Sequence, residues 1–481
     1  MNRRKFLASS ISAALGLSSC GGGSGSNSGG VTDNTDFTQT YFIPDELTGT
    51  LVGGRFQYNL ILQSGTTQFS SGVSTPTWGI NGNYLGPTIR LKNGDQVDLN
   101  FNNTLSESTT MHGHGMHVPA NMDGGVHQVI NAGATWTSSY TVNQHACTNW
   151  YHPHMKGVTA DHVINGLAGL IIIDDADSDA LDLPKRYGID DIPVIVQDRS
   201  FNADGSFDYN PTMQEIMRGW KGDTFMVNGV INPLLNVEAK QVRFRILNGS
   251  NSRVYTFAFA SGKAFKQIAS DNAFLEAPVS LTHLQLSPAE RAEIVVDFSG
   301  DLGNEEVFTD IASGKNLFKV NVSKVATAIT TLPNQLVMLA KLNQANAVNT
   351  RIFALSGGMG QLRINGVTMD LNVINETVPL DAIEIWEVTN NMNMVHNFHI
   401  HATHFQIIER NGSAANVPAN EQGFKDTVYL PPNETVKFIV KMVDYASVGP
   451  SPISAPDNAY MYHCHILEHE DAGMMGQFVV V

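Results

Sequence analysis

"INGNYLGPTIRLKNGDQVDLNFNN", residues 80–103, is the first of three related stretches in this chain. An Asn-Gly step opens it, and apolar residues such as Val97 and Leu99 then alternate with polar ones. Alternation of this kind is typical of a β-strand with one buried face. The same order recurs in "VNGVINPLLNVEAKQVRFRILNG" (227–249) and "INGVTMDLNVINETVPLDAIEIWEVTNN" (364–391), and each strand ends at an asparagine.

The repeat predicts the fold class. The Asn-Gly steps begin at residues 81, 228 and 365, and long amphipathic helices are scarce between them. Repeats of roughly 140 residues made of short strands indicate an all-β protein of three β-sandwiches in tandem. The expected domains are 39–178, 179–325 and 326–481.

Composition excludes one class of partner. The 481 residues carry a formal net charge of −16, and only 15% of them are charged. Because an acidic surface repels phosphates, we expect no nucleic-acid partner.

The N-terminus resembles an export signal. "MNRRKFLASSISAALGLSSC" places Arg3 and Arg4 before a short apolar stretch, which resembles a signal for the twin-arginine export machinery. The end "LSSC" resembles a lipoprotein processing box, so residues 1–19 are expected to be removed and Cys20 to carry a lipid. Residues 20–38, rich in Gly and Ser, are expected to form a flexible tether. The alternatives are an ordinary secretory signal and a soluble periplasmic product.

The histidines are concentrated in a few segments. Ten of the 16 lie in four motifs, whereas residues 163–395 contain only His283. The four motifs are His112 and His114 in "HGH", His152 and His154 in "HPH", His396, His399 and His401 in "HNFHIH", and His463, His465 and His469 in "HCHILEH". Four such pairs at the two ends of one chain indicate metal ligands.

Strand geometry divides these ligands between two sites. Neighbouring side chains on a strand point to opposite faces, so His463 and His465 share a face and Cys464 points away. Cys464, His469 and Met474 suit a blue copper site, which takes one thiolate, two imidazoles and a weak axial thioether. His396 is the candidate for the second imidazole, and the other eight histidines could surround a cluster of several coppers. Zinc, the competing metal, prefers closed four-ligand sites and does not account for eight additional imidazoles.

With these motifs in view, the chain resembles the three-domain multicopper oxidases, among them the bacterial laccases and the periplasmic copper-tolerance oxidases. The motifs that carry the resemblance are "HGHGMHV", "NWYHPHMKG", "HNFHIHATHF" and "HCHILEHEDAGMM", and it extends from about residue 40 to the C-terminus. It implies three cupredoxin-like Greek-key domains, four coppers per chain, and reduction of dioxygen to water.

The resemblance also implies a role for each site residue. A type 1 copper would be held by His396, Cys464, His469 and axial Met474. A type 2 copper would be held by His112 and His399. A type 3 pair would be held by His114, His152, His154, His401, His463 and His465. Asp123 and Glu470 match acidic residues that supply protons in the family; without the resemblance they would be a turn aspartate and a surface acid.

The reductant is left open between two substrates. We expect laccase-like oxidation of phenols or aromatic amines, because the methionine-rich insert of the copper-tolerance oxidases is missing and the edge of His396 should then be open. The alternative is Cu(I) oxidation for copper tolerance, with Met392 and Met394 beside His396 as thioether ligands. A copper-free scaffold on the same fold is disfavoured, because every ligand position is filled.

The N-terminal signal makes a prediction about location. Replacing Arg3 and Arg4 by lysine should leave the protein in the cytoplasm, and Cys20→Ala should release exported protein from the membrane fraction. Cell fractionation with immunoblotting measures both. Wild-type protein found entirely in the soluble periplasm would contradict the lipid anchor but not the export.

Overall fold

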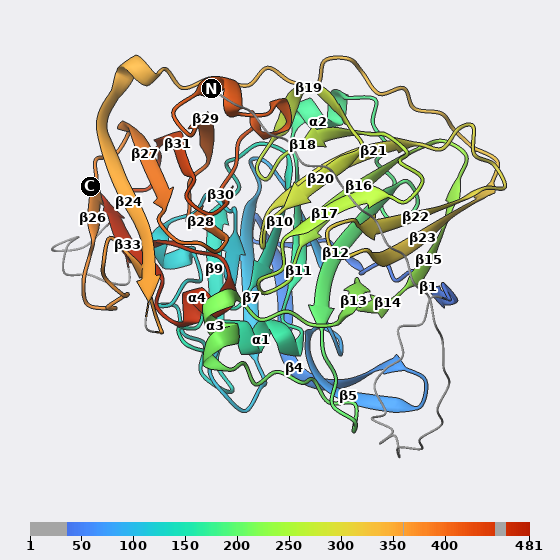
Figure 1. Cartoon of the computed structure of the whole chain (residues 1–481), viewed down its shortest axis with the longest axis horizontal. Coiled ribbons are helices and arrows are strands. Elements are labelled where there is room, and N and C mark those ends of the chain that lie inside the picture. Colours follow the sequence, from blue (N-terminus) through green and yellow to red (C-terminus); the bar gives the residue numbers. More distant parts are fainter. Residues whose placement is uncertain (1–35, 359, 448–457) are drawn as a thin grey trace, which may run out of the picture.

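The computed structural model describes residues 36–358, 360–447 and 458–481. The predicted signal, Cys20 and most of the tether lie outside these ranges. Strands dominate the described chain, and none of its helices is both long and apolar enough to cross a bilayer. Three sandwiches follow one another along the sequence, coloured from blue through green to red in Figure 1. The residue limits predicted for the three domains stay predictions.

The first sandwich encloses a core that includes Leu60, Phe101 and Ile171. One sheet has the order β2 (Glu46–Leu47), β6 (Thr88–Lys92), β11 (Gly169–Asp174), β10 (Cys147–His152) and β8 (His112–His114). The other has the order β3 (Thr50–Val52), β4 (Arg55–Ser70), β7 (Gln96–Asn103) and β9 (Thr135–Thr141), with β5 (Val73–Ile80) paired to β4.

The middle sandwich packs around Val194, Phe244 and Phe318. Its larger sheet has the order β14 (Val230–Ile231), β13 (Thr224–Val227), β12 (Asp191–Arg199), β16 (Gln241–Asn248), β21 (Arg291–Asp297), β18 (Phe265–Ala269) and β19 (Phe274–Leu281). Its second sheet has the order β1 (Gln39–Thr40), β15 (Pro233–Glu238), β23 (Lys315–Lys324), β22 (Glu305–Asp310), β17 (Tyr255–Phe259) and β20 (His283–Leu286). Residues 39–40 therefore pair with the middle sandwich, although they precede the first one in the chain.

The last sandwich packs around Trp386, Phe398 and Tyr462. One sheet has the order β25 (Gln361–Ile364), β24 (Ala347–Gly358), β27 (Ile383–Asn390), β31 (Thr435–Lys441) and β29 (Phe405–Arg410). The other has the order β26 (Glu376–Val378), β33 (Met475–Val480), β32 (Tyr460–His463), β28 (His396–Ile400) and β30 (Thr427–Leu430). The short helices of the described chain are α1 (Thr159–Asn165), α2 (Ala176–Ala180), α3 (Met213–Arg218) and α4 (Leu467–Asp471), with 3-10 turns at Ala120–Met122, Gln344–Asn346, Ala414–Asn416 and Ala419–Glu421.

The asparagine of each Asn-Gly step does the same work in all three repeats. Asn81, Asn228 and Asn365 adopt left-handed backbone conformations with φ of 57°, 49° and 52°, which asparagine tolerates better than most residues. Each side chain then pairs with the backbone of a neighbouring strand, accepting from one N–H and donating to one of its carbonyls; Asn228 also donates to the carbonyl of Phe42 at 2.8 Å. The N–H donors are Ile61 (2.7 Å), Ile195 (2.7 Å) and Ala354 (2.8 Å), and the carbonyls belong to Asn59 (2.9 Å), Pro193 (2.9 Å) and Ile352 (3.1 Å).

The asparagine that ends each repeated strand is a second feature common to the three repeats. Asn103, Asn248 and Asn390 are fully buried. Each side-chain oxygen accepts from the backbone N–H two residues later, at 3.0 to 3.1 Å, which turns the chain sharply. The Asn390 amide also donates to the carbonyl of Met394 at 2.9 Å. This bond fixes the loop just before His396.

The predicted alternation is confirmed in the first repeat and modified in the other two. Along β7 the buried residues include Val97, Leu99 and Phe101, as expected. Along β27 burial also alternates, but the expected buried face, with Ile383 and Ile385, is half-exposed, and the opposite face, with Trp386 and Val388, is buried.

Along β16 the face expected to be solvated is buried as well, because it packs against the first sandwich. Arg245 on that face donates to Asp191 at 2.7 and 2.9 Å, to Glu293 at 2.8 Å and to Thr148 of β10 at 2.8 Å.

Removing this buried arginine should be costly. Arg245→Met would leave the carboxylate of Asp191 buried without its main partner, and Glu293 would keep only one of its two arginine partners, Arg243, so the free energy of unfolding should fall by about 3 kcal/mol. Chemical denaturation followed by fluorescence measures this change. Lys92→Met, which removes an exposed ion pair with Asp179, is the control and should leave the denaturation midpoint unchanged. Equal effects of the two variants would contradict the role of Arg245.

Candidate metal centre

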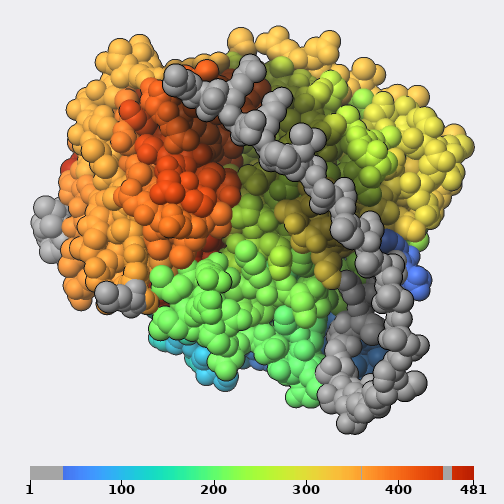
Figure 2. Space-filling view, in the orientation of Figure 1, coloured from blue at the N-terminus to red at the C-terminus, as the bar shows by residue number. Residues whose placement is uncertain are grey.

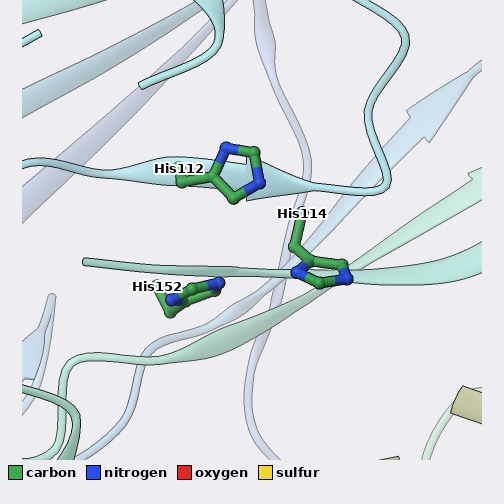
Figure 3. A group of neighbouring side chains, drawn as sticks. All are labelled: His112, His114 and His152. Atoms are coloured by element: carbon green, nitrogen blue, oxygen red, sulfur yellow. The ribbon is translucent and has the colours of Figure 1, made fainter. Parts of the chain in front are cut away.

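Eight histidines converge from the first and last sandwiches. In the first sandwich, β8 and β10 pair so that His112 lies opposite His152. In the last, β28 and β32 pair so that His399 lies opposite His463. Figure 3 shows the first of these groups, with rings from two neighbouring strands close together. All eight side chains are at most 1% exposed; they are His112, His114, His152, His154, His399, His401, His463 and His465.

Their ring nitrogens are close enough to share metal ions. In each of several groups the possible ligand atoms lie within 4.8 Å of one another: His112/His114/His152, His112/His399/His401 and His154/His401/His463. His465 joins them through its Nε2, which lies 3.4 Å from Nε2 of His152. The structure thus brings all eight predicted histidines together.

Hydrogen bonds from ring nitrogens to backbone carbonyls orient three of the imidazoles. His112, His152 and His399 donate through Nδ1 to the backbone carbonyls of Asp123 (2.8 Å), Pro153 (2.7 Å) and Asp426 (2.9 Å). The opposite nitrogens, Nε2 of His112 and of His399, are buried without a hydrogen-bond partner. Unpartnered buried nitrogens are costly unless they bind something. Rings tethered on one side and free on the other are suited to metal ligation.

Burial also favours the neutral form of seven of these rings, the form that binds a metal. Loss of solvation lowers the pKa of His154 to about 4. The same cause places the pKa values of six others well below their ordinary value: His112, His114, His152, His401, His463 and His465. The lone pairs of these seven imidazoles are therefore available at neutral pH.

Two buried carboxylates touch the cluster. Asp123 Oδ2 lies 2.7 Å from Nδ1 of His401, and its Oδ1 has no hydrogen-bond partner. Glu470 lies between two cluster histidines, with Oε1 3.4 Å from Nδ1 of His154 and Oε2 3.3 Å from Nδ1 of His463. Burial raises the pKa of both carboxyl groups. Glu470 is therefore not the surface acid that its local sequence alone would suggest, and Asp123, although it ends the 3-10 turn Ala120–Met122, directs its carboxylate to the cluster.

A second ligand group lies around Cys464, the residue between the cluster histidines His463 and His465 at the end of β32. Cys464 Sγ is 3.4 Å from Nδ1 of His396 and 3.5 Å from Nδ1 of His469, and these two nitrogens are 3.2 Å apart. All three residues are buried, and burial raises the pKa of Cys464 to about 12. A buried thiolate therefore requires a bound cation, which fits a copper ligand.

The backbone holds this second group in place. Cys464 N–H donates to the carbonyl of Met474 at 3.1 Å, and Met474 N–H donates to the carbonyl of His469 at 2.9 Å. The Met474 side chain is fully buried in the same apolar cluster as Cys464. The side-chain oxygen of Asn397 accepts from His465 N–H at 2.6 Å and lies 3.6 Å from Cys464 Sγ. The thiol and the cluster histidines are thus connected through one short segment.

The expectation that the edge of His396 is open is wrong. His396 is 1% exposed, and its Nε2 lies 3.2 Å from the sulfur of Met392. The edge of His469 is covered by α3 of the middle sandwich, because its Nε2 donates to the carbonyl of Met217 at 3.2 Å. Figure 1 shows α3 beside α4. The absence of a methionine-rich insert could not reveal this covering helix, which comes from a distant part of the chain.

Sequence reasoning missed Asp426. Its carboxylate accepts from His114 Nε2 at 2.9 Å, and its carbonyl accepts from His399 Nδ1. Two bonds of 2.7 Å from Arg291 of the middle sandwich hold that carboxylate. No local motif marks either residue, since the partners are separated by more than 100 positions. The middle sandwich therefore supports the cluster without supplying a ligand to it.

Comparison with known proteins agrees with this geometry. Three family models, each described as multicopper oxidase, match residues 62–178, 135–330 and 331–481. A curated relative, "Multicopper oxidase mco" of Staphylococcus haemolyticus, is 37% identical over 435 residues, 89% of each chain. "Cell division protein FtsP" of Yersinia pestis is 35% identical over 440 residues, 88% of each chain.

Solved structures give the same result. The crystal structure of a laccase from Pediococcus acidilactici superposes with a TM-score of 0.84 at 35% identity, covering 92% of this chain and 94% of that one. The three sandwiches are accordingly cupredoxin-like, as the motifs had implied.

Proposed function

The chain belongs to the multicopper oxidase family and is a copper oxidoreductase, and from this premise we propose that it couples one-electron oxidation of a small reductant to four-electron reduction of dioxygen to water. The observation that carries the proposal is the buried convergence of eight histidines beside a Cys/His/His/Met group. Bound copper would supply one-electron redox chemistry at Cys464 and dioxygen reduction at the histidine cluster.

Four coppers per chain fit the ligands. His396, Cys464, His469 and Met474 would hold the type 1 ion. His112 and His399, whose inward nitrogens have no other partner, would hold the type 2 ion. The type 3 pair would use His114, His152, His154, His401, His463 and His465. Cys464 is bonded directly to His463 and His465, so a short covalent path joins the two centres.

Asp123 and Glu470 would move the protons that dioxygen reduction consumes. Each touches cluster histidines, and each has a carboxylate oxygen without a hydrogen bond to protein. Burial raises the pKa of each carboxyl group, so each can hold a proton at a higher pH than an exposed acid. Such a group can deliver protons to a reacting centre that it contacts.

Phenols or aromatic amines are the proposed reductants. Support comes from the laccase that this chain matches over most of its length. His396 and His469, the two imidazole ligands of the type 1 site, are buried. An electron from the reductant must therefore pass through the residues that cover them, or these residues must move.

Oxidation of Cu(I) is the second candidate. The observation that favours it is the thioether of Met392, which lies 3.2 Å from Nε2 of His396. Met394 and Met217 of α3 are partly buried, and both pack against the apolar core of the last sandwich, which includes Met392. Thioethers are soft ligands that suit Cu(I). A copper-free scaffold on the same fold does not account for eight buried histidines oriented toward one another.

The thiolate assignment predicts the colour of the protein. Copper-loaded wild type should be blue and contain about four coppers per chain, whereas Cys464→Ser should be colourless with about three. Visible absorption and elemental analysis measure this. The matched control is Cys147→Ser, since Cys147 is also a buried free cysteine but belongs to none of the groups of possible metal ligands among the described residues. A blue Cys464→Ser protein would contradict the assignment.

Asp123→Asn should slow oxygen reduction without changing the blue centre. The amide keeps the shape of the side chain but carries no acidic proton, so reoxidation by dioxygen should slow by about a hundredfold. Stopped-flow absorption separates anaerobic bleaching by substrate, expected to be unchanged, from return of the blue colour on oxygen addition. Reoxidation at the wild-type rate would make Asp123 only a structural anchor for His401.

Substitution of Met392 and Met394 distinguishes the two candidate reductants. If Cu(I) is the substrate, Met392→Leu with Met394→Leu should abolish Cu(I) oxidation and spare phenol oxidation, because only thioether ligation is lost. If phenols are the substrate, as proposed, wild type should oxidise them without added copper. Oxygen uptake with each reductant measures both rates, and exposed Met338→Leu is the control. Phenol oxidation that requires excess copper would contradict the laccase-like proposal.

A further inference from the structure

Two histidines outside the ligand set occupy matching positions. "HGHGMH" (112–117) and "HIHATH" (399–404) share the spacing His-x-His-x-x-His. The first two histidines of each motif belong to the cluster. The third ones, His117 and His404, do not, although both lie at the interface of the first and last sandwiches.

Each of these third histidines bonds the backbone of the other motif. His117 Nδ1 donates to the carbonyl of Ala402 at 2.8 Å. His404 Nε2 donates to the carbonyl of Gly115 at 3.0 Å. Gly115 directly follows His114, and Ala402 directly follows His401, so each bond ends one residue beyond a cluster ligand of the opposite sandwich.

Both carbonyls belong to residues in left-handed backbone conformations. Gly115 has φ of 80° and Ala402 has φ of 58°. A side chain at Gly115 would come within 2.6 Å of Arg291, Asn149 and Asp426, so glycine is required there. Alanine disfavours this conformation, and Ala402 therefore needs support from its surroundings. The bond from His117 supplies it from across the interface.

The two bonds are not equally important. Nε2 of His117 lies 2.9 Å from Oδ2 of Asp444, so that ring is held at both nitrogens. The Ala402 carbonyl has no other side-chain donor among the described residues. The Gly115 carbonyl, by contrast, also lies within 2.8 to 3.2 Å of amide nitrogens from three other residues: Gln144, Asn149 and Asn272. Loss of His117 should therefore matter more than loss of His404.

We propose that His117 and His404 are positioning residues that form a reciprocal clamp, which keeps the histidine motifs of the first and last sandwiches in register around the cluster. The clamp lies at a cleft of about 340 Å³ between these sandwiches. His145 lines the same cleft but is exposed and bonds neither motif, which makes it the matched control.

The first test uses copper-free protein and is independent of the proposed function. His117→Leu removes the donor, whereas His117→Asn places an amide N–H near the position of Nδ1. Hydrogen–deuterium exchange should show loss of protection in residues 399–405 for His117→Leu, with protection restored in His117→Asn and unchanged in His145→Leu. Equal protection in His117→Leu and wild type would overturn the clamp, and so would equal loss in both leucine variants.

The second test rests on the proposed function, because it uses copper at the cluster. Against a graded chelator, His117→Leu should lose cluster copper at roughly tenfold lower chelator concentration than wild type, the low end for residues supporting metal ligands. His404→Leu should shift less, His404→Gln not at all, and the blue absorption should persist in each. Wild type without cluster copper would refute the proposed function but leave the exchange result standing. Parallel loss of blue and cluster copper would overturn the clamp.

Discussion

Docking of the first sandwich against the last is the constraint on which the molecule depends. Four cluster histidines come from each side of that interface, and neither set is complete alone. The rings are buried and several nitrogens have no protein partner, so the histidines themselves oppose the docking until something binds them. Other contacts must hold the two sandwiches together. The bonds made by His117 and His404 are such contacts. Arg291 of the middle sandwich bridges the other two, because it donates to Thr148 and Asn149 of the first and to Asp426 of the last.

The middle sandwich, which supplies no ligand, contacts the surroundings of both centres. Arg291 on β21 orients the carboxylate that His114 contacts, and the α3 carbonyl of Met217 accepts from His469. In Figure 2 the green segment of the middle third abuts the orange and red C-terminal third. The middle repeat therefore has the sandwich architecture and a supporting role, which fits a sequence that lacks histidine pairs but carries buried arginines.

Features that depend on local geometry could be predicted from the sequence. Strand periodicity alone separated Cys464 from His463 and His465, and the repeated asparagines marked equivalent turns in three sandwiches. Contacts between distant segments could not be predicted this way. Asp426 has no motif, and the cover over His396 and His469 combines a loop of the last sandwich with a helix of the middle one. The edge of His396 was predicted to be open because the methionine-rich insert is missing. The absence of that insert does not show which other residues cover the edge.

The pairing of β1 with β15 has a mechanical consequence. The described chain begins just before β1, and these two residues join it to the edge of the middle sandwich. If Cys20 carries the expected lipid, force transmitted through the tether of residues 20–38 would act on the middle sandwich, which supplies no metal ligand. The interface that holds the histidines would then be shielded from the motion of the membrane surface.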